Sequence, residues 1–190
     1  MTSSVVFQAL KHAWQSLEPL NLPMAVMGGI AMAYYGHSRG TKDVDLLISL
    51  SDASADTLID QLTKCNVRVP EKDSWKTIGE LQLCQTLYEP MDAYIDLQID
   101  LLVARGEYHR QSLDRRVAVE LPVAEITVDL LTCEDLLIHK LLAGRMIDRA
   151  DAIALLEWNR DQLDFEYLDL WIGRHGLVSE WNDIQNSAQK

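Results

Sequence analysis

The sequence is poor in cysteine, and the cysteines that it has are not grouped. Cys65, Cys84 and Cys133 are the three cysteines among 190 residues, without the spacing of a zinc site or a disulfide framework. We therefore expect a reducing, cytoplasmic location. Long apolar runs are absent as well, since none approaches the ~20 residues that cross a bilayer. The N-terminal segment lacks the order of a secretion signal, so neither secretion nor a membrane partner is expected.

Basic residues are in the minority. The chain has 17 Lys and Arg against 29 Asp and Glu, a formal net charge of -12. Because proteins that hold a long phosphate backbone normally present a basic face, this balance argues against an extended nucleic-acid surface. One local basic cluster is present, and the sequence leaves open whether it receives an acceptor phosphate or forms a solvated helix face. Its members are Arg105, His109, Arg110, Arg115 and Arg116.

Repeats, low-complexity tracts and Gly/Ser linkers are missing too. Periodicity predicts an α/β part over residues 1–130 and a helical part over 131–190 that packs on it. The predicted helices cover about 4–17, 29–37, 54–64, 107–115, 164–173 and 177–186, and the predicted strands 24–28, 43–49, 93–104 and 117–128. Residues 67–90 indicate a loop followed by a strand. Residues 133–158 form either one long helix or two, with Gly144 as the joint.

The first motif is the pair Gly28-Gly29, between an apolar strand and an apolar helix. A strand-to-helix turn exposes backbone N–H groups, and glycine lets a ligand approach them closely. A tight turn without any ligand explains the pair equally simply.

The second motif is Asp43-Val44-Asp45 in a predicted strand. Side chains alternate along a strand, so both carboxylates project from one face. Like charges this close repel unless a cation lies between them, and Mg²⁺ prefers such hard oxygen ligands. The alternative is a solvated strand end.

A third carboxylate is available in the strand AYIDLQIDLLVA, where Asp96 and Asp100 share the polar face. Asp100 lies deeper in the apolar run, so its charge needs the stronger reason, and we interpret Asp96 as solvent-facing. Two metal ions ~4 Å apart would use about three bridging carboxylates for in-line phosphoryl transfer. Lys140, on an apolar helix, and Arg39, just before the Asp43 strand, either reach solvent or meet a phosphate.

Together these segments resemble the nucleotidyltransferase superfamily, the polymerase-β-like fold, and within it the branch of AbiEii-type toxins. GGIAMAYYGHSRGTKDVDLLI resembles the branch's GG…A…G…R-x-T-x-D-x-D signature, IDLQIDLL its third-carboxylate strand, and EDLLIHKLLAGRMIDRADAIALLE its K-x-x-A-x-R-x-x-D-x-x-D helix. The resemblance implies an α+β fold with a mixed sheet flanked by helices and a C-terminal helical segment. It also implies transfer of a nucleoside monophosphate from an NTP to an acceptor hydroxyl.

The resemblance assigns roles residue by residue. Asp43, Asp45 and Asp100 would hold Mg²⁺, with Mn²⁺ as the alternative ion, and Asp100 would act as or orient the base. The nucleotide-binding residues would be Gly28, Gly29, Arg39, Thr41 and Lys140. Many superfamily members carry Gly-Ser where this chain has Gly28-Gly29, so its phosphate contacts there would be main-chain. Asp148 and Asp151 fall in the matched helix, but Arg145 and Arg149 lie within pairing range, which favours a structural role equally.

Two other readings stay open. An aminoglycoside- or lincosamide-type nucleotidyltransferase shares a similar opening motif, although the Trp after GG and the acidic run around DxD are missing here. A catalytically silent module that binds a nucleotide or a protein partner is the second. The acceptor is left open between a small molecule, tRNA and protein, and so is a homodimer or an antitoxin partner.

Overall fold

The computed structural model describes residues 2–50, 54–71, 75–91 and 95–188. Their strands form a seven-stranded mixed sheet in the order β3-β4-β5-β2-β1-β7-β6. The bounds are β1 Met24–Met27, β2 Asp43–Ile48, β3 Lys76–Ile78, β4 Leu81–Tyr88, β5 Leu97–Ala104, β6 Val117–Leu121 and β7 Ile126–Leu130. The predicted α+β class with a mixed sheet is therefore confirmed.

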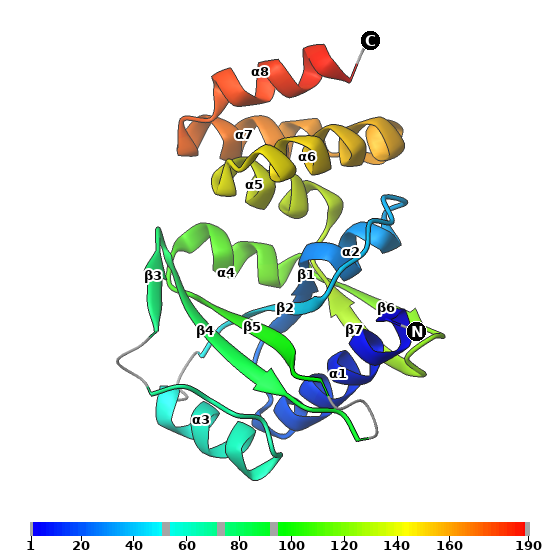
Figure 1. Ribbon diagram of the computed structural model, residues 1–190. Helices are drawn as coiled ribbons and strands as arrows, with labels where there is room; N and C mark the ends of the chain where they lie inside the picture. The colour runs from blue at the N-terminus through cyan, green and yellow to red at the C-terminus, as the bar shows by residue number, and fades with distance from the viewer. Residues whose placement is uncertain (1, 51–53, 72–74, 92–94, 189–190) are drawn as a thin grey trace.

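Helices cover both faces of this sheet. Figure 1 shows α1 and α3 below the sheet, α2 and α4 above it, and α5 to α8 stacked beyond them. Their bounds are α1 Thr2–Leu17, α2 Gly28–Tyr34, α3 Ala55–Lys64, α4 Glu107–Asp114, α5 Cys133–Ala143, α6 Met146–Asn159, α7 Phe165–His175 and α8 Val178–Ser187. None of the helices in the described residues is long and apolar enough to span a membrane.

The central strands are placed by their side-chain alternation. In β5 every second side chain is fully buried, beginning with Leu97 and Ile99, while Gln98 and Asp100 lie on the opposite, less buried face. β2 pairs in parallel with β5 and antiparallel with β1. Because partners in register point to the same side, the polar face of β5 continues across β2.

Two predicted strands differ from the structure, and one observed strand was not predicted. The strand expected over 93–104 begins at Leu97; Ala93 and Tyr94 lie outside the described residues. The strand expected over 117–128 is a hairpin of β6 and β7, because Pro122 cannot continue a strand ladder and Glu125 takes a positive φ of 50° in the turn. The short, exposed strand β3 was not predicted.

Gly144 ends α5 in a left-handed conformation (φ 65°) that favours glycine. The segment 133–158 is consequently two helices, and the junction turns the chain so that α6 packs back against α5. Arg145 then caps α6, with the Asp148 side chain returning to the Arg145 backbone N–H. This junction brings α6 toward the segment before β2, where Asp151 of α6 pairs with Arg39.

Candidate active site

Three aspartates share one face of the two central parallel strands. Asp45 on β2 is in register with Asp100 on β5, and Asp43 is in register with Gln98. The two-residue spacing of Asp43 and Asp45 puts both on the same side of β2. The strands thus bring the three predicted carboxylates to one region of the sheet.

Burial and the neighbouring carboxylates raise the pKa values of Asp45 and Asp100. Burial, followed by the charges of Asp43 and Asp100, raises the pKa of Asp45 from 3.8 to about 7. Burial also raises the pKa of Asp100, against hydrogen bonds from Gln98 and Gln85 that lower it. The Gln98 amide nitrogen lies 2.8 and 3.0 Å from the two Asp100 carboxylate oxygens. Such a face favours a cation or a proton.

The donor set fits a hard divalent ion such as Mg²⁺, because it consists of carboxylate oxygens on a common face. In the described part of the chain no three His, Cys, Asp or Glu side chains are already closed around one ion position. Asp43, Asp45 and Asp100 are the residues that could hold a metal, and their side chains would have to move closer together to do so.

The glycine pair makes room for the side chains of this face. Gly28 has a φ of +61°, and a Cβ there would lie 1.8 Å from Asp45 Oδ2. A Cβ on Gly29 would lie 2.6 Å from both Cβ and Oγ1 of Thr41. Close approach of Asp45 and Thr41 thus explains both glycines without a ligand.

Thr41 lies beside a carboxylate as well as beside the glycine turn. Its Oγ1 is 2.7 Å from Asp43 Oδ1 and 3.2 Å from the Asp43 carbonyl oxygen, so the hydroxyl donates to Asp43. A hollow of about 350 Å³ borders the same segment. Its lining includes Phe7, Ile30, Arg39 and Thr41.

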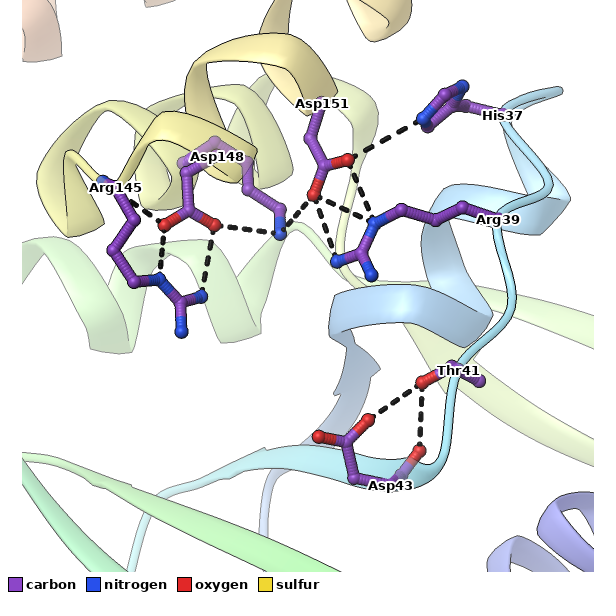
Figure 2. A network of polar contacts seen from close by, with 8 residues as sticks. His37, Arg39, Thr41, Asp43, Arg145, Asp148 and Asp151 are labelled. Atoms are coloured by element: carbon purple, nitrogen blue, oxygen red, sulfur yellow. Dashed lines mark hydrogen bonds and ion pairs between the residues drawn. The ribbon is translucent and has the colours of Figure 1, made fainter.

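Lys140 is buried in an ion-pair network contributed by α5, α6 and the segment before β2. Its Nζ lies 3.1 Å from Asp148 Oδ1 and 2.8 Å from Asp151 Oδ2. Arg145 and Arg39 bind the two aspartates from either side, and His37 lies 3.5 Å from Asp151. Figure 2 shows Arg145 with Asp148, and Arg39 and His37 with Asp151, above Thr41 and Asp43.

The network keeps its two carboxylates ionised. Burial would raise the pKa of Asp148, but hydrogen bonds from Arg145 and Lys140 hold it below the ordinary value. The pKa of Asp151 is lowered against burial by Arg39 and Lys140 in the same way. Lys140 and Arg145 also act at longer range, since their charges oppose the rise in the pKa of Asp45. These cations therefore lie near enough to influence the carboxylate face.

The remaining candidate residues, Asp96 and the basic cluster, do not gather into one site. Asp96 precedes β5, is exposed and pairs with Arg68, as the solvent-facing interpretation expects. The basic cluster is not a continuous surface: His109 is buried, and the Arg116 guanidinium lies 2.7 Å from Asp129. The Arg115 guanidinium lies 3.8 Å from the centre of the Tyr167 ring.

Arg145 was not among the predicted site residues. The sequence signal for it was its place in the helix motif beside Lys140, three residues before Asp148. The pairing of Arg39 with Asp151 was also missed, because 112 residues separate them.

Solved structures similar to this chain are nucleotidyltransferase folds at low identity. An antigenic nucleotidyltransferase-like protein from Paracoccidioides brasiliensis is 22% identical, with 99% of this chain and 92% of that chain covered and a TM-score of 0.57. The antibiotic-resistance factor ANT(2'')-Ia is 14% identical, with 100% and 99% covered and a TM-score of 0.58. JHP933 from Helicobacter pylori is 14% identical, with 97% and 81% covered and a TM-score of 0.55. These likenesses show the fold.

No curated protein matches the chain. The family model described as nucleotidyl transferase AbiEii toxin, Type IV TA system, matches residues 8–169, which include the carboxylate face, the glycine turn and the ion-pair network. The chain belongs to the AbiEii nucleotidyltransferase toxin family.

Proposed function

We propose that this protein is a metal-dependent nucleotidyltransferase that moves a nucleoside monophosphate from an NTP to a hydroxyl acceptor. The acceptor oxygen forms a bond to the α-phosphorus, the bond from that phosphorus to the bridging oxygen breaks, and pyrophosphate leaves. One observation carries the proposal: Asp43, Asp45 and Asp100 share one face of adjacent parallel strands, where burial and the charges of Asp43 and Asp100 raise the pKa of Asp45 to about 7.

Asp43, Asp45 and Asp100 would hold Mg²⁺ or Mn²⁺, which when bound neutralises charge on the attacking and leaving oxygens. Asp100 has a raised pKa, which suits it to take the proton of the acceptor hydroxyl or to orient that hydroxyl. The chain's main further contribution is to position the two substrates.

The nucleotide phosphates would meet Lys140 and Arg145, the cations that already act on Asp45. The main-chain N–H groups of Gly28 and Gly29 are the other candidates for contact with the triphosphate. Arg39 and Thr41 border the hollow beside this turn, which suits them to the edge of the nucleotide site.

The test compares Asp43→Asn and Asp45→Asn with Asp96→Asn, which removes an exposed carboxylate close to the same sheet. Each purified variant is incubated with Mg²⁺, the four NTPs in turn and total RNA or protein, and pyrophosphate release is measured. We expect loss of release in the first two variants and wild-type release in the third. Wild-type release by Asp43→Asn or Asp45→Asn would contradict the proposal.

Incubation of the wild-type protein with labelled NTPs and candidate acceptors, together with calorimetry, separates the other interpretations of the site. Labelling of tRNA or of a protein would identify a toxin-like acceptor, in keeping with the family. Labelling of an aminoglycoside, with resistance in a sensitive host, would identify an antibiotic-modifying enzyme. Nucleotide binding by calorimetry with no pyrophosphate release under any condition would identify a silent binding module.

A further inference from the structure

The charged groups above the carboxylate face alternate in sign along one chain of contacts. Arg145 binds Asp148, Asp148 and Asp151 hold Lys140 between them, and Asp151 binds Arg39. Asp148 and Asp151 are 0% and 1% exposed, so their charges depend on these partners. The two terminal residues of this ion-pair network, Arg145 and Arg39, connect different parts of the protein.

At one end of the network, Arg145 contacts a residue of its own helix turn. Arg145 and Asp148 are three residues apart at the start of α6, with Nε 2.6 Å from Oδ2. Arg145 is 70% exposed, and its pairing with Asp148 completes the cap of its own helix. We expect its loss to change the first turn of α6 and the charge above the site without moving a segment of the sheet.

The Arg39 end joins distant parts of the protein. Arg39 Nε lies 2.9 and 3.1 Å from the two carboxylate oxygens of Asp151, and Nη2 lies 3.0 Å from Oδ2. This two-pronged contact fixes both the position and the orientation of the guanidinium. It therefore anchors the segment before β2 to helix α6.

The segment from Arg39 to Asp43 has no regular structure of its own before β2. Gly40 makes no close contact at its Cβ position. Thr41 is the next anchored residue, packed on Gly29 and donating its hydroxyl to Asp43. Figure 2 shows Arg39, Thr41 and Asp43 following one another along this segment, with Asp151 above it.

We propose that Asp151 is a positioning residue for the metal site, which acts through Arg39 and Thr41 to orient the Asp43 carboxylate. The inference rests on the proposed function, because it takes Asp43 as a metal ligand. It gives Asp151 a role distinct from that of Asp148: both hold Lys140, but only Asp151 also holds the segment that carries Asp43. The helical part thereby contributes to metal binding without supplying a ligand.

Arg39→Gln is the sharpest test, because Asp151 keeps Lys140 when Arg39 is lost. Arg145→Gln is its matched control, the same substitution at the other end of the network. The measurement is Mn²⁺ affinity without nucleotide, followed by the EPR signal of free Mn²⁺. Circular dichroism and the melting temperature show that each variant is folded.

The direction of the change in Mn²⁺ affinity distinguishes a residue that orients a metal ligand from one that acts only through its charge. Removal of a cation near a metal site strengthens metal binding by simple electrostatics, whereas loss of a partner that orients a ligand weakens it about 10- to 100-fold. We expect Arg39→Gln to bind Mn²⁺ at least about 10-fold more weakly than wild type, and Arg145→Gln to bind it equally or more tightly. Equal or tighter binding by Arg39→Gln would overturn the inference.

A second pair of variants keeps the test valid if Arg39→Gln does not fold. Thr41→Ser retains the hydroxyl that donates to Asp43, and Thr41→Val removes it with little change in shape. The inference expects weaker Mn²⁺ binding in Thr41→Val alone, and equal affinities in the two variants would refute it. Absence of Mn²⁺ binding by the wild-type protein would instead contradict the proposed function, so the two failures are distinguishable.

Discussion

Gly28 offers a direct test of how closely the glycine turn approaches the carboxylate face. In Gly28→Ala the new Cβ would lie 1.8 Å from Oδ2, 2.6 Å from Cγ and 2.9 Å from Cβ of Asp45. Rotation about χ1 can move the carboxylate away, but it leaves the Asp45 Cβ in place. Relief of the clash therefore has to move the backbone of the turn or of β2.

The substitution has two separable costs. A non-glycine residue at φ +61° loses roughly 1–2 kcal/mol of folding free energy from strain alone. Gly176→Ala supplies the matched control, because Gly176 has a φ of +69° and nothing within 4 Å of its Cβ position. Both variants should be destabilised by this backbone strain, and only Gly28→Ala should also displace Asp45.

We expect Gly176→Ala to lose about 1–2 kcal/mol of unfolding free energy and to keep wild-type Mn²⁺ affinity. Gly28→Ala should lose more stability, bind Mn²⁺ at least about 10-fold more weakly and lose nucleotide transfer by roughly 100-fold. Urea unfolding and Mn²⁺ EPR measure the first two quantities, and pyrophosphate release measures the third. Equal Mn²⁺ affinities in the two variants would refute the argument that Gly28 is required for the position of Asp45.

Two further predictions concern stability. Burial and neighbouring His109 lower the pKa of His139 from 6.5 to about 3; the unfolded chain then binds the extra proton first, so stability is full above pH 6.5 and falls as the pH drops below it. Between pH 7.5 and pH 5 the buried His139 should lower the unfolding free energy by about 2 kcal/mol. Urea titrations at the two pH values should find a smaller loss in His139→Gln. The same loss in wild type and variant would contradict the prediction. Trp171 is 3% exposed and Trp158 68%, so Trp171→Ala should cost about 3–5 kcal/mol and Trp158→Ala less than about 0.5 kcal/mol in the same assay; similar losses would show that exposure is not the deciding factor.

The central elements of the fold were predictable because periodicity and glycine signals agreed there. Alternation placed Asp100 and Gln98 on one face of β5, and Gly144 marked the end of α5. The hairpin of β6 and β7 was missed because apolar residues continue on both sides of its turn, although Pro122 was a readable break. The three exposed residues of β3 carry no pattern that could identify a strand.

The carboxylate face was predictable for a related reason. The two-residue spacing of Asp43 and Asp45 requires one common side of a strand, whatever the rest of the fold. That Asp45 and Asp100 share a register could not follow from either strand alone, because strand pairing depends on the whole sheet. The burial of His109 beside His139, with ring centres 5.0 Å apart, depends in the same way on how α4 meets α5.

The partner of Asp151 shows where reasoning from helix spacing reaches its limit. Arg149 is two residues from Asp151, and residues two apart on a helix do not face each other; it reaches Asp183 on α8 instead. Asp148 has a suitable partner in Arg145 one turn away, so spacing alone could predict that pair. Asp151 faces inward, where an unpaired charge costs several kcal/mol, and helix α6 offers it no cation on that side. Its charge therefore requires partners from other elements, Lys140 and Arg39, and this requirement connects the C-terminal helices to the strand that carries Asp43.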